Sequence, residues 1–339
     1  MKHLELEATA RTLVAKGKGL LAADESFPTI QKRFTALGIE SSEENRRNYR
    51  DMLFTTPGVE EFISGVIMFD ETIRQKSKNG VSFVDILKRK GIIPGIKVDK
   101  GTIAMPGFPE EKITVGLDGL VERLKEYRDM GARFAKWRAV ITIGPRIPTS
   151  SCINANAHAL ALYAAITQEA GLVPVVEPEV LMDGDHTIER CEDATVAALT
   201  AVFARLNEYR VQFEGMLLKP NMVLAGKQSP KQASVAEVAE ATIRTLKRTV
   251  PAAVPGIVFL SGGQTAETAT LHLNAMNAMG VYPWEISFSF ARALQDPALK
   301  TWKGSESNVA AAQKEFHHRA KCNSAARYGK YTEQLEKAA

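Results

Sequence analysis

The chain is poor in cysteine and histidine. Only three cysteines and six histidines occur among its 339 residues. Cys152, Cys191 and Cys322 are far apart and odd in number, and they form no CxxC pair, so we expect free thiols in a reducing compartment. The histidines do not gather where strands are expected to end, which argues against a histidine-rich metal centre that would polarise a ketone.

The chain also lacks a strong net charge and any long apolar run. Its 43 basic and 39 acidic residues leave a charge of only +4. This excess is too weak and dispersed to indicate nucleic acid, although local basic clusters remain suited to phosphate. Residues 1–18 have no apolar signal-peptide core, and no later run is long enough to span a bilayer. We therefore expect a cytoplasmic protein with neither nucleic acid nor a membrane as a partner.

No Ser/Gly-rich linker and no shift in composition divides the chain, so one domain over residues 1–339 suffices. Eight short apolar segments have β-strand character, and helical sequence fills nearly every gap between them. The segments are 19–26, 62–69, 92–100, 132–140, 172–179, 216–219, 256–263 and 284–292. Strict β-then-α alternation predicts a parallel sheet, and eight units match a closed barrel of the α/β class, (β/α)8, followed by a short polar tail from about residue 328.

The alternative architecture is a doubly wound open sheet. That fold would need a glycine-rich phosphate turn after its first strand, whereas Gly17 and Gly19 precede that strand. Two serine–glutamate pairs have the spacing of a capping box and predict helix starts, namely Ser41 with Glu44 and Ser234 with Glu237.

The segment that ends on Lys219 carries the main chemical signal. A short apolar run, 216–218, leads into this lysine, and Pro220 then stops further ladder pairing. A core strand has no structural use for an unpaired ammonium, because its desolvation is costly. Burial favours the neutral amine, whose lone pair can attack a carbonyl. The other interpretation is a lysine that caps the strand with its stem packed and its head in water.

Polar residues also collect at the ends of the other predicted strands, where barrel active sites lie. Three pairs are spaced two residues apart, so both members of each pair face the same side of their strand. The pairs are Lys97/Asp99, Lys136/Arg138 and Glu177/Glu179. We expect them to face the barrel mouth with Lys219; the alternative is a structural layer of ion pairs that closes the barrel.

The motifs around these residues resemble class I fructose-1,6-bisphosphate aldolase, in order and spacing, from about residue 17 to residue 331. They are LAADES (21–26), GIKVDKG (95–101), FAKWR (134–138), VEPE (176–179), LLKPNM (217–222) and LSGGQ (260–264). The resemblance implies a TIM barrel and a glycolytic and gluconeogenic lyase that reversibly cleaves fructose 1,6-bisphosphate into dihydroxyacetone phosphate and glyceraldehyde 3-phosphate. It implies no cofactor and no metal, a sugar phosphate as the small-molecule partner, and a homotetramer.

The resemblance also implies catalytic roles. Lys219 would form the Schiff base with the substrate ketone, and Lys136 would hold a second positive charge beside it. Glu177 would shuttle protons while the carbinolamine forms and loses water, and Glu179 would orient Glu177 or share its proton. Asp24 would take the proton of the C4 hydroxyl as the C3–C4 bond breaks.

The two phosphates of such a substrate need cationic or amide partners. The 261–263 turn offers backbone N–H groups at a helix start, and Arg292 adds a bidentate fork. Ser26, Lys32, Arg33 and Lys97 are candidates for the other phosphate, although Lys32 and Arg33 also fit a solvated helix face. The full set of substrate- and phosphate-binding candidates is Ser26, Arg33, Lys97, Arg138, Ser261, Gly262, Gly263, Ser289, Ala291 and Arg292.

Three departures from the family pattern matter. The family's Ser-Thr-Gly-Ser is Ser-Phe-Pro-Thr at 26–29, and its Ser-Tyr-Gly-Arg is Ser-Phe-Ala-Arg at 289–292. The terminal tyrosine that helps exchange the C3 proton has no counterpart, since Tyr331 is the last tyrosine. Glu177, a water or a flexible Tyr331 would then carry that proton. Another Schiff-base phospho-sugar aldolase, a transaldolase and a non-enzymatic scaffold barrel are the remaining alternatives, and the choice between fructose bisphosphate and fructose 1-phosphate stays open.

Overall fold

Eight parallel strands close into a barrel in the computed structural model, which describes residues 2–338. In chain order they are β1 (Gly19–Ala23), β2 (Ile63–Met68), β3 (Ile93–Lys97), β6 (Phe134–Ile141), β7 (Val173–Val180), β8 (Leu217–Leu218), β9 (Gly256–Phe259) and β10 (Glu285–Phe290). Each strand pairs with the next, and β10 pairs with β1 to close the ring. The eight predicted strands and the closed (β/α)8 barrel are confirmed.

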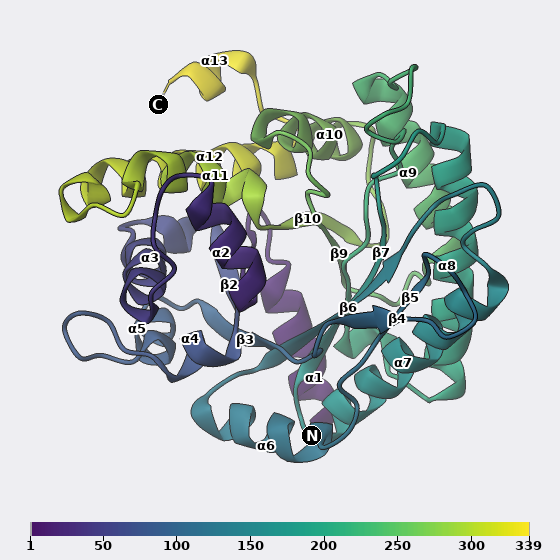
Figure 1. The fold of residues 1–339 in the computed structure, drawn as a ribbon, viewed down its shortest axis with the longest axis horizontal. Helices are drawn as coiled ribbons and strands as arrows, with labels where there is room; N and C mark the ends of the chain where they lie inside the picture. The colour runs from purple at the N-terminus through teal and green to yellow at the C-terminus, as the bar shows by residue number, and fades with distance from the viewer. Residues whose placement is uncertain (1, 339) are drawn as a thin grey trace.

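Helices fill the crossovers and surround the barrel (Figure 1). They are α1 (Lys2–Leu13), α2 (Phe27–Thr35), α3 (Glu43–Thr55), α4 (Asp70–Arg74), α5 (Phe83–Arg89), α6 (Leu120–Met130), α7 (Ser150–Glu169), α8 (Ile188–Glu208), α9 (Val235–Thr249), α10 (Ala266–Ala278), α11 (Arg292–Trp302), α12 (Val309–Arg327) and α13 (Glu333–Lys337). Across residues 2–338, none of these helices has both the length and the apolar character needed to cross a membrane.

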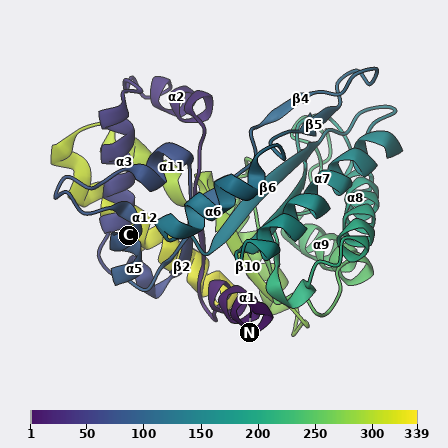
Figure 2. The same cartoon turned by 90° about the horizontal axis from the view of Figure 1, so that it is seen from below.

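Helix α1 closes one end of the barrel. The buried Leu6 and Leu13 of α1, and Val14 directly after it, belong to the same apolar cluster as the interior side chains Phe134 and Val258. Figure 2 shows α1 at this end, while α2 and a hairpin of β4 (Thr102–Ala104) and β5 (Lys112–Thr114) project from the other. Because the amino ends of the strands are covered by apolar packing, polar chemistry is confined to their carboxyl ends.

Two glycines make room for the ring of Phe134 in the barrel interior. A Cβ added at Gly95 would lie 2.3 Å from Cζ of Phe134, and one at Gly65 would lie 3.1 Å from Cε1 of the same ring. Real side chains do not approach so closely, so β3 must carry glycine where it passes Phe134.

One of the two predicted capping boxes at helix starts is confirmed. The capping box of Ser234 with Glu237 is present at α9, as predicted. The other predicted pair was wrong: α3 is capped by Ser42, whose Oγ accepts a hydrogen bond from Asn45 N at 3.2 Å. Two serines are adjacent at this position, and α3 uses Ser42, whose backbone is extended. The β4–β5 hairpin was not predicted.

Residues 329–338 pack against the rest of the protein. Tyr331 is only 7% exposed, and its N–H donates to Asn274 Oδ1 at 2.8 Å. Its hydroxyl donates to Glu336 Oε2 at 2.5 Å, and the carboxylate of Glu336 also pairs with Arg319 on α12 at 2.5 Å. The polar C-terminal segment is therefore attached to α10 and α12 through specific bonds.

Candidate active site at the carboxyl ends of the strands

Lys219 lies at the end of β8, where the sequence placed it. Its N–H donates to Val176 O at 2.8 Å, which continues the pairing with β7, and its side chain is 4% exposed. Its Nζ is 3.2 Å from Oε1 of Glu177. Among the residues that the structure describes, Glu177 supplies the only carboxylate within ion-pair distance of this amine.

Glu177 bridges two lysines. Its Oε2 is 3.0 Å from Nζ of Lys136, and that Nζ is 2.7 Å from Oδ2 of Asp24. A chain of alternating charges, Asp24–Lys136–Glu177–Lys219, thus comes from four strands. Asp24 and Lys219 directly follow β1 and β8, whereas Lys136 and Glu177 lie within β6 and β7. Oε2 of Glu177 is buried, and its approach to Lys136 does not have hydrogen-bonding geometry. A buried carboxylate oxygen without a hydrogen bond at a strand end is a signal of proton chemistry.

The charge states of Asp24 and Lys136 reinforce each other. Burial alone would raise the pKa of Asp24, but Lys136 and then Lys219 hold it well below its usual range. Burial would likewise lower the pKa of Lys136, but Asp24 and Glu177 hold it above its usual value. Asp24 is therefore a carboxylate and Lys136 an ammonium throughout the physiological pH range.

A second layer of ion pairs lies beside this chain. Nζ of Lys97 is 2.6 Å from Oδ1 of Asp99, and Arg138 pairs with Glu179. Burial would lower the pKa of Arg138, yet Glu179 and Glu177 raise it above its ordinary value. The expectation that Glu179 orients Glu177 does not fit this geometry, because the carboxylate of Glu179 is bound to Arg138. Lys97 and Arg138 are thus already paired with carboxylates, beside the chain that holds Lys219.

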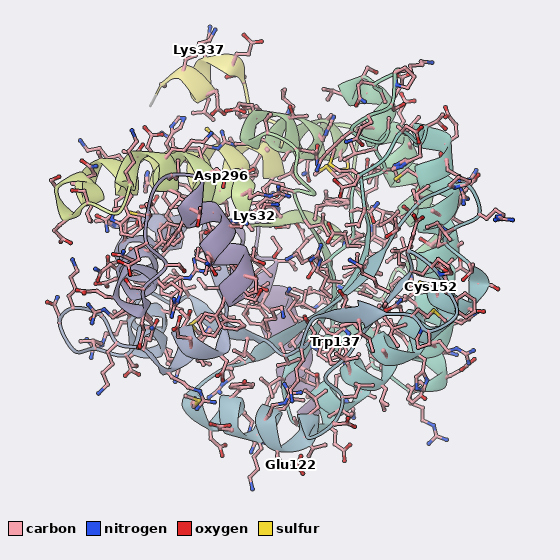
Figure 3. The ribbon with its side chains drawn as sticks, viewed as in Figure 1. Lys32, Glu122, Trp137, Cys152, Asp296 and Lys337 are labelled. Atoms are coloured by element: carbon pink, nitrogen blue, oxygen red, sulfur yellow. The ribbon has the colours of Figure 1, made fainter. Side chains whose placement is uncertain are left out.

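The alternation of β6 is as predicted. Lys136 and Arg138 belong to these ion pairs, whereas Trp137 between them is fully buried and stacks on Tyr163 of α7 with ring centroids 5.5 Å apart. Trp137 lies inside the molecule, whereas Glu122 and Lys337 lie on its outside (Figure 3).

The 261–263 turn joins β9 to α10. Gly262 and Gly263 have φ of 59° and 90°, a left-handed backbone that favours glycine. A Cβ at Gly263 would lie 3.0 Å from Nη2 of Arg292, so the guanidinium at the start of α11 approaches this turn. Ser289 at the end of β10 is 1% exposed, and its hydroxyl has no hydrogen-bond partner among residues 2–338. The structure thus brings together the predicted phosphate candidates Ser261, Gly262, Gly263, Ser289, Ala291 and Arg292.

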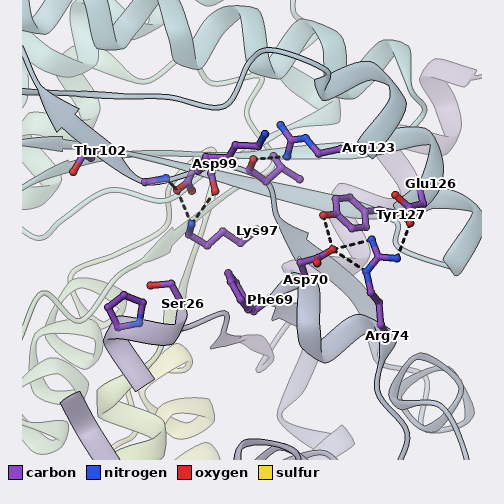
Figure 4. A pocket seen from close by; sticks show the side chains of 14 residues that line it. Ser26, Phe69, Asp70, Arg74, Lys97, Asp99, Thr102, Arg123, Glu126 and Tyr127 are labelled. Carbon is purple, nitrogen blue, oxygen red and sulfur yellow. Dashed lines mark hydrogen bonds and ion pairs between the residues drawn. The ribbon is translucent and has the colours of Figure 1, made fainter. Parts of the chain in front are cut away.

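On the opposite side of the mouth, Ser26 and Lys97 line a cavity of about 650 Å³. The cavity extends between α4 and α6, where Tyr127 and Arg74 both bind Oδ1 of Asp70, at 2.8 and 2.9 Å (Figure 4). Its lining includes the cations Arg74, Lys97 and Arg123.

Arg33 has a different neighbourhood from the one expected. Its Nη1 is 2.5 Å from Oε1 of Glu25, and Arg50 binds the other oxygen of the same carboxylate at 2.5 Å. Burial would lower the pKa of Arg33, but Glu25 raises it. The charge of Arg33 is thus already compensated inside the protein, while Lys32 of the same helix is exposed.

Two features were missed from the sequence. The sequence analysis named Glu25 only within the LAADES motif. Asp24 and Glu25 are adjacent after a strand, and they pair in different places, Asp24 with Lys136 and Glu25 with Arg33 and Arg50. Lys227 was not singled out, although a cation in a loop after a barrel strand is a candidate for anion binding. A Cβ at Gly263 would lie 2.9 Å from its Nζ.

One group of side chains has the composition of a metal site. His318, Cys322 and Glu336 have ligand atoms within 4.8 Å of one another, on α12 and α13. The carboxylate of Glu336 is already neutralised by Arg319, and burial raises the pKa of the Cys322 thiol to about 12. We therefore interpret this group as part of the attachment of the C-terminal segment.

The fold and the site together define a class: a (β/α)8-barrel enzyme whose strand-end lysine is buried against a carboxylate. The family model described as "Fructose-bisphosphate aldolase class-I" matches residues 5–339. The chain belongs to this family, whose members are lyases.

Individual relatives agree over nearly the whole chain. A "Probable fructose-bisphosphate aldolase class 1" of Xanthomonas campestris pv. campestris is 58% identical, covering 96% of this chain and 98% of the relative. "Fructose-bisphosphate aldolase 4, cytosolic" of Arabidopsis thaliana is 53% identical over 98% and 84%. A solved fructose-bisphosphate aldolase from Plasmodium falciparum, in complex with TRAP and a small-molecule inhibitor, superposes with a TM-score of 0.96 at 52% identity, covering 98% of this chain and 96% of that one.

Proposed function

We propose that this protein reversibly cleaves fructose 1,6-bisphosphate into dihydroxyacetone phosphate and glyceraldehyde 3-phosphate through a Schiff base on Lys219. The observation that carries this proposal is the buried amine of Lys219, 3.2 Å from a carboxylate oxygen of Glu177 that can move a proton. Membership of the class I aldolase family supports the substrate and the reaction.

The first step joins Lys219 to the substrate. Lys219 passes its ammonium proton to Glu177, and the neutral amine then attacks C2 of the open-chain ketone. A proton moves from the nitrogen to the former carbonyl oxygen, and a carbinolamine results. Glu177 delivers a proton to the C2 hydroxyl, which leaves as water, and the protonated imine remains. The C3–C4 bond then breaks as a base removes the proton of the C4 hydroxyl, and its electron pair moves toward the imine nitrogen. The aldehyde departs and leaves an enamine, which is protonated at C3 and hydrolysed.

Asp24 and Glu177 are the two carboxylates that are candidates for the base at the C4 hydroxyl. A carboxylate whose pKa is held well below its usual range, as that of Asp24 is, binds protons weakly. We therefore assign this proton transfer to Glu177, and we assign to Asp24 the placement and charge balance of Lys136. Lys136 in turn holds a permanent positive charge beside Glu177.

The two phosphates occupy opposite sides of the mouth. Arg292, Ser289 and the 261–263 turn with the backbone of Ala291 bind the phosphate on the ketone side. Ser26 and Lys97 bind the aldehyde-side phosphate, with Arg138 at the border between the two regions. Arg33 contributes by holding Glu25 and the start of α2.

Membership of the family supports the proposed compartment and oligomeric state. The Arabidopsis relative bears the word cytosolic in its name, which supports glycolytic and gluconeogenic work in the cytoplasm. The chain works as one barrel domain and uses neither a metal nor an organic cofactor. Four copies associate into a homotetramer. Sedimentation equilibrium measures this stoichiometry, and a monomeric mass at working concentration contradicts it.

Covalent trapping tests the reaction directly. Borohydride added with dihydroxyacetone phosphate, in the presence of EDTA, is expected to inactivate the enzyme and to mark Lys219 in a peptide map. Lys219→Met is the matched control and is expected to trap nothing. Activity that EDTA abolishes and zinc restores, or a label on another lysine, contradicts the proposal.

A further inference from the structure

Lys227 lies in a loop that is held against another loop of the barrel mouth. Its N–H donates to Met182 O at 2.8 Å, and the neighbouring N–H groups of Gly226 and Gln228 donate to His186 O and Gly184 O at 2.8 and 2.9 Å. A Cβ at Gly226 would lie 2.2 Å from Gly184 O, so only glycine allows this contact. The loops after β7 and β8 therefore fix the position from which the side chain of Lys227 projects.

The amine of Lys227 approaches the same glycine as Arg292. From a Cβ position built on Gly263, Nζ of Lys227 is 2.9 Å away and Nη2 of Arg292 is 3.0 Å away. Since both atoms are about 3 Å from one point, the two cations lie within about 6 Å of each other, where like charges repel. Two cations that converge on a left-handed glycine turn form a site that an anion stabilises.

The partners of the two cations differ. Nζ of Lys227 is 3.1 Å from Oδ1 of Asp183, a pair whose side chains are 34% and 63% exposed and therefore weakly bound. Arg292 has no carboxylate within ion-pair distance among residues 2–338. Lys227 can thus exchange the exposed carboxylate of Asp183 for an anion of higher charge, and Arg292 can bind the same anion without breaking an ion pair.

We propose that Lys227 is a specificity-determining residue for the ketone-side phosphate, and this inference rests on the proposed aldolase function. A phosphate monoester carries a charge of about −1.5 to −2 near neutral pH, so one guanidinium leaves roughly one charge uncompensated. Lys227 supplies the second cation, and it makes the site favour a phosphorylated ketone over a neutral one such as dihydroxyacetone.

Steady-state kinetics in the condensation direction separates the two phosphate sites. Lys227→Met is expected to raise KM for dihydroxyacetone phosphate by about five- to ten-fold, the loss of one partly exposed charge-assisted contact. KM for glyceraldehyde 3-phosphate and kcat stay within about two-fold, because the chemistry and the other phosphate are untouched. Lys227→Arg restores most of the affinity. Lys231→Met, which removes an exposed lysine from the same loop, behaves as the wild type.

Unchanged kinetics of Lys227→Met, or a rise in KM for glyceraldehyde 3-phosphate alone, overturns the inference. Inorganic phosphate provides a readout that does not require turnover. Its affinity, measured by ³¹P line broadening with the intact protein, is expected to fall several-fold in Lys227→Met and not in Lys231→Met. If the wild type lacks aldolase activity but this difference persists, the proposed function fails and the phosphate role of Lys227 stands. If activity is present and phosphate affinity is equal in both variants, Lys227 has no such role.

Discussion

At the scale of single residues, the site is a neutral cluster of two carboxylates and two amines. Asp24, Lys136, Glu177 and Lys219 are connected at 2.7, 3.0 and 3.2 Å, and each is buried or nearly so. Buried ions are tolerated when their charges cancel and their geometry is good. Because these four charges cancel, the removal of any one of them leaves an uncompensated charge beside the reacting atoms. The expected effect depends on which residue is replaced.

Glu177→Gln is expected to lose kcat by on the order of 10²–10⁴. Among residues 2–338, Glu177 is the one carboxylate in ion-pair distance of Lys219, so it can shuttle the protons of the Schiff base. Glu179→Gln is expected to lose about ten-fold or less, since Glu179 acts through Arg138. The measurements are kcat for cleavage and the rate of borohydride trapping. Equal losses in both variants show that the two glutamates work as a unit and refute the separation of roles.

Asp24→Asn is expected to lower the free energy of unfolding by about 3 kcal/mol at neutral pH, the typical cost of removing one partner of a buried pair. The pKa of Asp24 is lower in the folded protein than in the unfolded chain. Its stabilising contribution is therefore fully present above the unfolded value of about 3.9 and is lost as the pH falls below it. Urea unfolding should show a constant difference between variant and wild type from pH 5 to 8; a difference that changes within that range contradicts the assignment.

At the scale of elements, Arg319 connects the helices at the end of the chain. Its side chain is 2% exposed, and Nη2 donates to Ala266 O and Thr270 Oγ1 at 3.0 and 2.5 Å. Nη1 binds Glu336 on α13. This pairing explains why a polar segment that looks like a tail in sequence is ordered against α10 and α12.

Tyr331→Phe is expected to leave cleavage and the hydrogen exchange of dihydroxyacetone phosphate within a few-fold of the wild type. The reason is that the hydroxyl of Tyr331 is bound to Glu336 and its ring is 7% exposed, so it is not placed to carry the C3 proton. A selective collapse of exchange, with Schiff-base formation intact, shows instead that Tyr331 carries that proton.

Glu336→Ala serves as the structural counterpart, because it leaves Arg319 without its carboxylate. It is expected to reduce the free energy of unfolding by about 1–3 kcal/mol at neutral pH. Burial would raise the pKa of Glu336, but Arg319 and Tyr331 lower it, so its contribution is present above about 4.5 and is lost at more acidic pH. An unchanged free energy of unfolding at pH 7 contradicts the proposed attachment.

At the scale of the whole molecule, the apolar core and the charged residues of the site lie at opposite ends of the barrel. The apolar cluster around Phe134 fills the end that α1 covers, and the ion pairs occupy the other end. Stability and reactivity therefore depend on different layers of the same strands.

Gly95→Ala tests this separation. The added methyl would meet three atoms of the Phe134 ring at 2.3–2.4 Å, and such overpacking costs about 1–3 kcal/mol. We expect a lower Tm with kcat at permissive temperature within about three-fold of the wild type. The double variant Gly95→Ala/Phe134→Leu should recover part of the lost stability. If its loss in the free energy of unfolding exceeds the sum of the losses of the two single variants, the steric explanation is contradicted.

The sequence by itself determined the eight strands, their alternation with helices, and which charged side chains share a face of their strand. These properties depend on short-range periodicity, so Lys219, Lys136 and Glu177 were found with the correct facing. The capping box of Ser234 was found for the same reason. Where two serines were adjacent, as at 41 and 42, local spacing alone did not distinguish them.

Only the tertiary structure decided which charges pair. Glu179 binds Arg138 and Arg33 binds Glu25, and Lys227 reaches Gly263 across two loops. These partners are separated by up to 41 residues in sequence or lie on different elements, so no local pattern specifies them. The electrostatic energy of an ion depends on distance and burial in space, and those quantities exist only once the barrel has closed.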